Sequence, residues 1–400
     1  MISLADRVNM LAESETLAMT RISRELQSQG KDVINLSIGE PDFDTPLFIK
    51  NAGKKAIDDN FSHYTPVPGY LDLRQAICKK FKRDNNLDYT PDDIVVSTGA
   101  KHSLINVLMA VVNPGDEVIV PVPYWVSYKE MIKLVGGVEV NIAATIDQDF
   151  KITPQQLDKA ITAKTKLFMF NSPSNPTGSV YHKHELEALA KVLQNHPHVL
   201  VLSDEIYEHI NFAGKHESFG QFEYLKDRVV TVNGVSKGYA MTGWRIGFIG
   251  APRYIAQACV KLQGQFTSGT SSIAQKASVA ALECNPKEMQ EMKEMLAKFK
   301  ERRDLLLSLL NAIPGVKTNI PDGAFYVFPD VSAYYGKSDG ETKINNGADL
   351  CNYILYNVYV AIVPGSAFGD ENCIRISYAT SNEQIIEAVR RIRLALEKLK

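Results

Sequence analysis

The sequence predicts an α/β fold: a large unit built on a mostly parallel sheet that helices cover, and a smaller α+β unit after it. Two observations predict the large unit. From about residue 90 to residue 250, short runs rich in Val, Ile and Phe alternate with helical patterns. Most of these runs are too continuously apolar for a sheet with one wet face, so a sheet covered on both faces is expected. A third observation, the change of pattern after residue 285, predicts the smaller unit.

The large unit is expected to alternate strands and helices along one central sheet. Strands are predicted at residues 94–97, 117–121, 167–170, 199–203, 229–232 and 246–250. Helices are predicted at residues 101–112, 124–135, 184–194 and 253–264, where apolar residues recur at helical spacing.

The last third of the chain has a different character. Residues 285–311 form a charged amphipathic pattern with Pro286 near its start, which predicts a long helix. Strands are expected at 324–328, 358–363 and 374–378, and a closing helix at 381–400. We therefore divide the chain into an N-terminal arm that forms part of the small domain (1–45), a large domain (46–285) and a small C-terminal domain (286–400).

The composition excludes several classes of function. The 400 residues carry 44 Lys and Arg against 46 Asp and Glu, a net charge of −2, so the dense basic face of a nucleic-acid-binding protein is not expected. No long apolar run predicts a membrane span, and the charged N-terminus lacks the apolar core of a signal peptide. The five cysteines are scattered, which favours a reducing compartment, and a cytoplasmic protein is therefore expected. No metal site is predicted, because neither the cysteines nor the two histidine pairs have suitable partners nearby in the sequence.

Polar motifs follow several predicted strands, at the sheet edge where α/β proteins bind ligands. In TVNGVSKGYAMTGWRIG, Ser236 and Lys237 lie in a loop of small residues, with Arg245 further along. A lysine in such a loop is usually solvated, but a desolvated lysine forms a Schiff base with a carbonyl group. Arg245 is suited to hold a phosphate through two hydrogen bonds.

A carboxylate and an amide follow two neighbouring strands. Asp204 ends the run VLVLSD, and Tyr207 comes shortly after it. Asp204 is either a solvated helix cap or a buried carboxylate that faces a cationic ring nitrogen, with the phenol beside the ring. Asn175, in NSPSNPTG, lies in a turn and is expected to offer its amide at the same edge.

Two further motifs are suited to anions. Gly99 and Ala100, in STGAKHS, join a strand to a helix, and backbone N–H groups at such a helix start bind anions. Arg375, in CIRISYA, lies in a predicted strand between apolar residues. If its side chain points inward it needs an anionic partner, whereas an outward one would reach solvent.

Together and in this order, the motifs resemble those of the class I/II aminotransferases, enzymes of fold type I that depend on pyridoxal 5′-phosphate (PLP). Within that family the sequence is similar to the I-gamma subgroup of bacterial aspartate aminotransferases. The resemblance extends from LSIGEPDFDTP to RISYATS, and SDEIYEH and SKGYAMTGWRIG are its most specific motifs. It implies that residues 46–285 bind PLP and that the protein is a homodimer with shared active sites.

The resemblance also implies a role for each motif residue around the PLP ring. Lys237 would hold PLP as an aldimine and then move the proton between substrate and cofactor. Asp204 would pair with the ring nitrogen, and Tyr207 and Asn175 would hydrogen-bond the 3′ oxygen. Trp125, in PYWVSY, would stack on the ring.

The phosphate of PLP would be held by groups around one helix start: the side chain of Arg245, the backbone of Gly99, Ala100 and Lys101, and Tyr64 from the other subunit.

One position departs from the family pattern. Many relatives have a serine where this chain has Gly234, and Ser236, next to the lysine, is the hydroxyl that remains as a cofactor contact.

For the substrate, the resemblance implies that Arg375 binds the α-carboxylate, together with the Gly39 backbone and Asn175, under Trp125. Lys101, with Ser14 and Thr16, would bind a second carboxylate. Aspartate and 2-oxoglutarate are therefore the expected substrates, converted to oxaloacetate and glutamate by a ping-pong aldimine/ketimine mechanism. Alternatively, Lys101 is exposed and contributes only its backbone.

Other functions stay open at this point. Related enzymes transaminate aromatic amino acids, prephenate or kynurenine, and a C–S β-lyase of the same fold would keep the lysine, the aspartate and the arginine. A transcriptional regulator with an aminotransferase-like domain is disfavoured, because only about 45 residues precede the α/β unit and they show no basic helix-turn-helix pattern.

Overall fold

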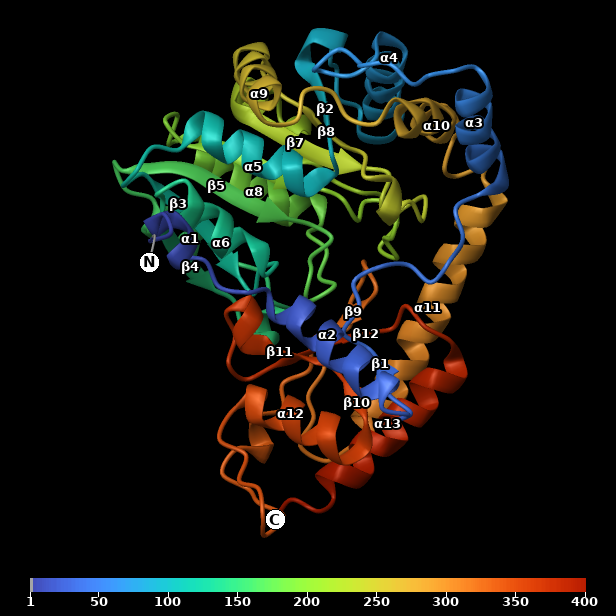
Figure 1. Ribbon diagram of the computed structural model, residues 1–400. Coiled ribbons are helices and arrows are strands. Elements are labelled where there is room, and N and C mark those ends of the chain that lie inside the picture. The colour runs from blue at the N-terminus through green and yellow to red at the C-terminus, as the bar shows by residue number, and fades with distance from the viewer. Residues whose placement is uncertain (1–2) are drawn as a thin grey trace.

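The structure, a computed structural model, describes residues 3–400. Figure 1 shows a larger α/β part and a smaller part, with the long helix α11 (Gln290–Asn311) running along one side from the first to the second. No helix in this described range is long and apolar enough to span a membrane.

Within residues 3–400, seven strands form the central sheet in the order β2-β8-β7-β6-β5-β3-β4. Their bounds are β2 (Ile94–Ser97), β3 (Glu117–Val122), β4 (Val138–Ala143), β5 (Thr165–Asn171), β6 (Leu200–Asp204), β7 (Val229–Gly234) and β8 (Gly247–Gly250). Neighbouring strands are parallel except at β8, which is antiparallel to both β7 and β2. The predicted mostly parallel sheet is thus confirmed.

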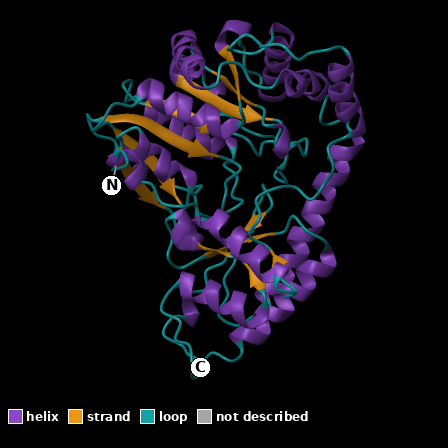
Figure 2. Cartoon of the chain, viewed as in Figure 1, coloured by secondary structure: helices purple, strands orange, loops and turns teal. Residues whose placement is uncertain are grey.

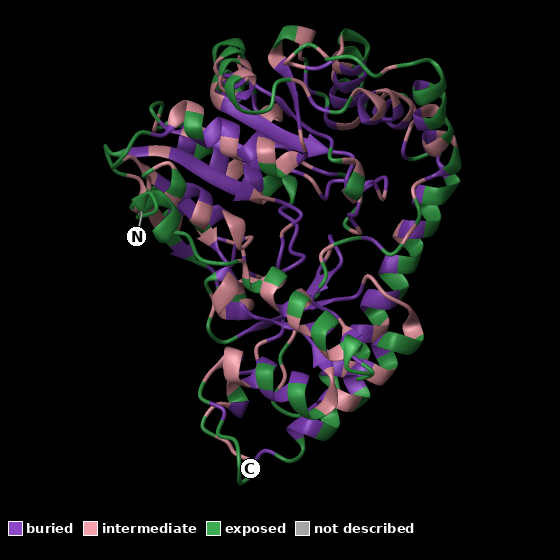
Figure 3. Ribbon diagram, in the orientation of Figure 1, coloured by how far each residue is buried: buried purple, intermediate pink, exposed green. Residues whose placement is uncertain are grey.

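Helices cover both faces of this sheet, and Figure 2 shows them layered around it. They are α3 (Leu47–Asp58), α4 (Leu71–Lys80), α5 (Ala100–Val111), α6 (Ser127–Leu134), α7 (Pro154–Ala160), α8 (Lys183–Gln194), α9 (Arg253–Phe266) and α10 (Ser272–Glu283). Along β5, Leu167 and Met169 enter the core that α5, α6 and α9 cover, whereas Phe168 and Phe170 enter the core under α7 and α8. Because both faces are covered, the central strands β5, β6 and β7 are mostly apolar and buried, and Figure 3 shows the sheet buried beneath helices with exposed outer sides.

The smaller part is built from short strands and three helices. Strand β1 (Ile34–Asn35) pairs in parallel with β10 (Val360–Ala361), and β11 (Val363–Pro364), β12 (Ile374–Ser377) and β9 (Tyr326–Val327) form an antiparallel sheet. Around them lie α11, α12 (Gly347–Val358) and α13 (Asn382–Leu396). The N-terminal segment carries α1 (Asp6–Asn9) and α2 (Glu15–Ser28), and β1 joins it to the C-terminal strands.

Two expected elements differ from the structure, and one strand was not expected. The helix expected from residue 285 begins at Gln290, because the Asn285 side chain bonds Lys287 and Glu288 and closes a turn before it. The strand expected at 358–363 is two short strands preceded by the end of α12. Strand β4 was not expected, since it lies at the edge of the sheet, where only Ile142 of its residues is buried. The domain limits near residues 45 and 285 stay predictions.

Candidate active site

A cavity of about 350 Å³ lies where β5, β6 and β7 end at their carboxyl sides and the smaller part meets the sheet. Its lining includes every site residue expected from the sequence except Gly99 and Tyr64: Ser14, Thr16, Gly39, Ala100, Lys101, Trp125, Asn175, Asp204, Tyr207, Ser236, Lys237, Arg245 and Arg375. The fold therefore gathers residues that are hundreds of positions apart around one space.

Lys237 enters this cavity from the loop after β7. Its ammonium donates a hydrogen bond to the carbonyl of Gly39 and lies 5.7 Å from the ring centroid of Tyr207 and 5.8 Å from that of Phe325. Burial, together with the charge of Arg375, lowers the pKa of Lys237 to about 8. A much larger share of this amine than of an ordinary lysine is therefore neutral, and nucleophilic, near neutral pH.

Asp204 ends β6 and is 4% exposed. The Tyr128 hydroxyl donates a hydrogen bond of 2.7 Å to Oδ2, and the Ile206 N–H donates one of 3.3 Å to Oδ1. Burial nevertheless raises the pKa of Asp204 to about 6. Among residues 3–400 it forms no ion pair, so a cationic group of a ligand would supply the charge that favours its ionised form.

Arg375, on β12, is 2% exposed and lies between the rings of Tyr326 and Phe368, at 4.6 and 4.9 Å. Nη1 donates to Asn175 Oδ1 (3.0 Å) and Nη2 donates to the carbonyl of Ser37 (2.6 Å), whereas Nε is buried without a partner. In the part of the chain that the structure describes, no carboxylate pairs with this guanidinium. A buried cation with neutral partners is suited to bind an anion from outside.

A second anion-binding place lies at the start of α5. Gly99 caps this helix with φ +82°, and a Cβ there would come within 2.3 Å of Arg245 Nη2. Glycine thus lets the Arg245 guanidinium lie against the helix start, where backbone N–H groups are free to bind an anion. Gly99 therefore acts here by leaving space, and Ala100 lines the cavity.

The packing of the sheet explains why glycine occupies position 234. A Cβ at this position would lie 2.8 Å from the carbonyl oxygen of Ile246, so the strands β7 and β8 leave no room for a side chain. The hydroxyl available near Lys237 is that of Ser236, which is buried and lines the cavity.

The rim of the cavity carries the groups expected to meet a second carboxylate. Lys101 Nζ lies 4.8 Å from the centroid of the Trp125 ring, and Ser14 Oγ is 2.8 Å from Thr16 Oγ1. All four residues line the cavity, and Lys101 as a whole is exposed. Its amine is thus available to a ligand while its backbone belongs to the first turn of α5.

Tyr64 is 100% exposed and does not reach the cavity of its own chain. The loop that carries it is nonetheless fixed. Gln263 donates to the carbonyl of Val67 (2.8 Å), and Gln275 donates to Thr65 Oγ1 (3.2 Å). An exposed tyrosine on an anchored loop is suited to a contact with another molecule.

The sequence did not single out three residues that shape the site. Tyr128 bonds Asp204, Tyr326 bonds Tyr207, and Asn171 bonds both the Asp204 carbonyl (2.8 Å) and the Asn175 N–H (2.8 Å). A signal existed for Asn171, which opens the motif that contains Asn175. No such signal existed for Tyr128 and Tyr326, which in the sequence resemble ordinary aromatic residues of a helix and a strand.

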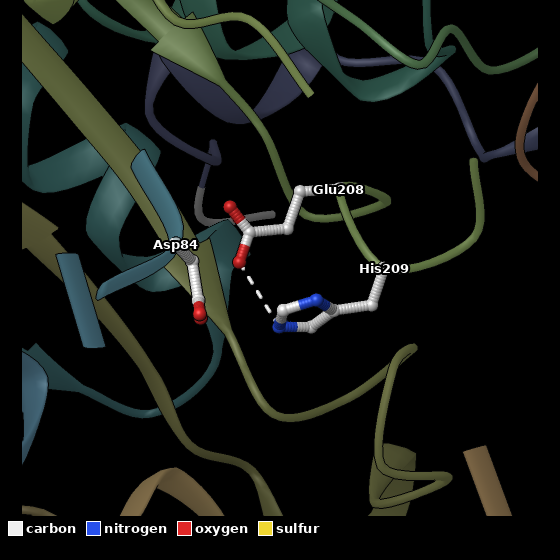
Figure 4. Close-up of side chains that lie close together, drawn as sticks. All are labelled: Asp84, Glu208 and His209. Carbon is white, nitrogen blue, oxygen red and sulfur yellow. Dashed lines mark ion pairs between the residues drawn. The ribbon is translucent and has the colours of Figure 1, made fainter. Parts of the chain in front are cut away.

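A separate cluster, shown in Figure 4, brings together the buried Glu208 and the half-buried Asp84 and His209. Its ligand-type atoms resemble a metal site, but Glu208 already pairs with the Lys80 ammonium and, at 3.0 Å, with His209 Nε2. Although burial opposes the charged form, the Lys80 ammonium and the contact with His209 hold the pKa of Glu208 well below its usual range. The cluster is therefore an ion-pair network that anchors the segment just after Asp204 and Tyr207.

The chain is similar to known proteins along its whole length. The sequence pattern described as aminotransferase class I and II matches residues 31–392. A bifunctional aspartate aminotransferase and glutamate/aspartate-prephenate aminotransferase of Petunia hybrida is 49% identical, over all of this chain and 84% of the relative. An aspartate/prephenate aminotransferase of Cereibacter sphaeroides is 48% identical over 98% of each chain. The crystal structure of the aspartate aminotransferase from Rhizobium meliloti superposes over 100% of both chains with a TM-score of 0.96 at 44% identity.

Proposed function

The chain belongs to the class I and II aminotransferases, transaminases that use PLP, and from this premise we propose that it transfers the α-amino group of aspartate to 2-oxoglutarate, giving oxaloacetate and glutamate. One observation carries the proposal. The cavity has a buried guanidinium without an anionic partner, Arg375, and a separate ammonium at its rim, Lys101. Two separated cations in one cavity suit a substrate with two carboxylates.

The cavity residues fit PLP. Asp204 is a buried carboxylate suited to a ring cation, Lys237 is an amine with a lowered pKa, and the start of α5 with Arg245 is suited to a phosphate. We assign Tyr207 and Asn175 to the 3′ oxygen, Trp125 to the ring face and Ser236 to the phosphate side. When bound, PLP supplies an electron sink that stabilises the carbanion left when a proton leaves the substrate Cα.

The protein's own part is to position groups and to move a proton. Arg375 and Asn175, together with the Gly39 backbone, would hold the α-carboxylate and so orient the Cα–H bond. Lys237, tethered in the same cavity, would take that proton and return it, since its lowered pKa suits both tasks near neutral pH. Asp204 would keep the ring nitrogen protonated through its negative charge.

The lowered pKa of Lys237 predicts how uptake of PLP depends on pH. Because the neutral amine attacks the aldehyde, the rate of uptake by cofactor-free protein should rise with pH through about 8 and then level off. An ordinary lysine would give a rise that continues to about 10.4. Stopped-flow absorbance of PLP mixed with the protein measures this rate. A rate that still climbs steeply between pH 9 and 10.5 would show that the amine is not desolvated.

The assembly of the protein and its location in the cell are also part of the proposal. We propose a homodimer in which the exposed Tyr64 completes the phosphate site of the other subunit, because the anchored loop presents it away from its own cavity. We also propose a cytoplasmic location, which the five scattered cysteines support.

The assay that tests the reaction separates transfer from lysis. The protein is incubated with aspartate and 2-oxoglutarate, and separately with cystathionine, and glutamate and pyruvate are measured. Glutamate from the first mixture is the expected result. Pyruvate from cystathionine without glutamate from the first mixture would replace the transaminase by a C–S β-lyase.

A second acceptor, prephenate, is favoured by the names of the relatives from Petunia hybrida and Cereibacter sphaeroides. Prephenate also carries two carboxylates, so it suits the same pair of cations. Parallel assays with glutamate or aspartate as donor, and 2-oxoglutarate or prephenate as acceptor, rank the two reactions directly.

Replacement of Lys101 by alanine tests the side chain alone, because the backbone N–H at the start of α5 remains. The kcat/KM for aspartate should fall about fivefold, since a partly exposed ion pair contributes up to about 1 kcal/mol. The kcat/KM for tyrosine, which lacks a distal carboxylate, should hardly change. Equal losses for both donors would mean that Lys101 serves the cofactor and not the substrate carboxylate.

A further inference from the structure

Tyr326, on β9 of the smaller part, touches several of the groups that the proposed reaction needs. Its side chain is fully buried, and its hydroxyl lies 2.8 Å from the hydroxyl of Tyr207. The Arg375 guanidinium stacks on its ring, 4.6 Å from the centroid. Gly39 packs against it so closely that a Cβ there would come within 2.9 Å of the Tyr326 hydroxyl oxygen.

The bond between the two hydroxyls has a preferred direction. Each phenol has one hydrogen to donate and can also accept one. Within residues 3–400, the hydrogen bond to Tyr207 is the one that the Tyr326 hydroxyl forms. Both hydroxyls are buried and both residues line the cavity, so the direction of the bond depends on which phenol gives its hydrogen to a ligand. Under the proposed function Tyr207 gives its one hydrogen to the 3′ oxygen of PLP, and the bond between the two phenols then requires Tyr326 to donate.

The hydrogen of Tyr207 is within reach of a ligand, because Tyr207 lines the cavity together with Lys237 and Asp204. A ligand oxygen in the cavity can accept it. A hydroxyl that already accepts a hydrogen bond is also a stronger donor, since hydrogen bonds in a chain polarise one another.

We propose that Tyr326 is a positioning residue, which donates to Tyr207 and thereby commits the Tyr207 proton to the 3′ oxygen of PLP, while its ring supports the Arg375 guanidinium. This inference rests on the proposed function. Tyr326 of the smaller part would then orient both the contact of Tyr207 with the cofactor and the carboxylate-binding Arg375.

The test uses the holoenzyme of Tyr326→Phe, which keeps the ring under Arg375 and removes the proton. The readout is the pH midpoint at which the visible absorption of the bound cofactor changes, measured without substrate. Donors to the 3′ oxygen stabilise its anion, so a weaker donor should move the midpoint upward, by about 0.5 of a pH unit. The kcat for aspartate should fall about threefold to tenfold, and its KM should stay within about twofold, because Arg375 keeps its stacking partner.

A double-variant cycle separates positioning from a general structural effect. In a Tyr207→Phe background the added Tyr326→Phe change should leave the midpoint unmoved, because there is no Tyr207 proton to orient. Tyr378→Phe is the matched control: Tyr378 is also fully buried, donates to the carbonyl of Ala324 (3.1 Å) and is not part of the cavity lining. The Tyr378→Phe variant should show the same pH midpoint of cofactor absorption as the parent protein.

The outcomes are distinct. An unmoved midpoint in Tyr326→Phe, or a shift that persists in the Tyr207→Phe background, would overturn the inference and leave the proposed function standing. A parent protein that binds no PLP, or whose bound cofactor shows no pH-dependent absorption, would overturn the proposed function itself.

Discussion

Replacement of Lys237 by alanine is expected to lower kcat for aspartate and 2-oxoglutarate by about 10⁴-fold or more, the upper end of what a positioned acid–base group contributes. In the cavity the amine lies beside Gly39, Tyr207 and Phe325, and its pKa is lowered to about 8. None of the other cavity residues combines a flexible amine with this position, since Lys101 lies at the rim.

The measurement is a coupled assay of oxaloacetate formation, with PLP added in excess so that weaker cofactor retention does not limit the rate. Lys183→Ala, at the exposed start of α8, is a suitable control and should keep the parent rate. A Lys237→Ala protein that transaminates at the parent rate would contradict the assigned role.

Replacement of Asp204 by asparagine is the second change with a large expected effect. The amide has nearly the same shape, so it should keep the contact with the Tyr128 hydroxyl that the carboxylate accepts at 2.7 Å. It has no negative charge, however, and so cannot hold a proton on a facing ring nitrogen. We expect kcat to fall about 10²–10³-fold, as when one preorganised electrostatic group is lost from an active site.

Rapid mixing with aspartate under single-turnover conditions isolates the chemical step in this variant. PLP content, measured on the same sample, should stay near one per chain, and Asp58→Asn, on the exposed end of α3, serves as the control. If Asp204→Asn kept the parent single-turnover rate, the carboxylate would be structural only.

The sequence was informative where one local pattern decides the outcome. Strand β2 was predicted at the residues where it is found, because every position in it is buried and its first three residues are Ile or Val. Strand β4, at the sheet edge, has exposed and half-exposed positions and therefore no continuous apolar run. Helix α10 was also missed, since its small Ala and Ser residues pack against α3 and α4 without the usual large apolar stripe.

The same distinction holds for the site. Asp204, Asn175 and Lys237 were expected there because each lies in the segment that follows a predicted strand. Tyr326 was not, since its partner Tyr207 is 119 residues away and only the docking of β9 onto the large part brings the two hydroxyls together. The sequence also showed nothing of the space that Gly99 leaves for Arg245, which depends on two backbones meeting.

The central claim, that Lys237 binds the cofactor, has a direct measurement. The purified holoenzyme is reduced with borohydride, digested, and searched by mass spectrometry for the peptide that carries the reduced cofactor. The proposal predicts that the label is on the peptide containing SKGYAMTGWR, at Lys237, in a ratio near one per chain. A label on another lysine, or none on a protein that still transaminates, would contradict it.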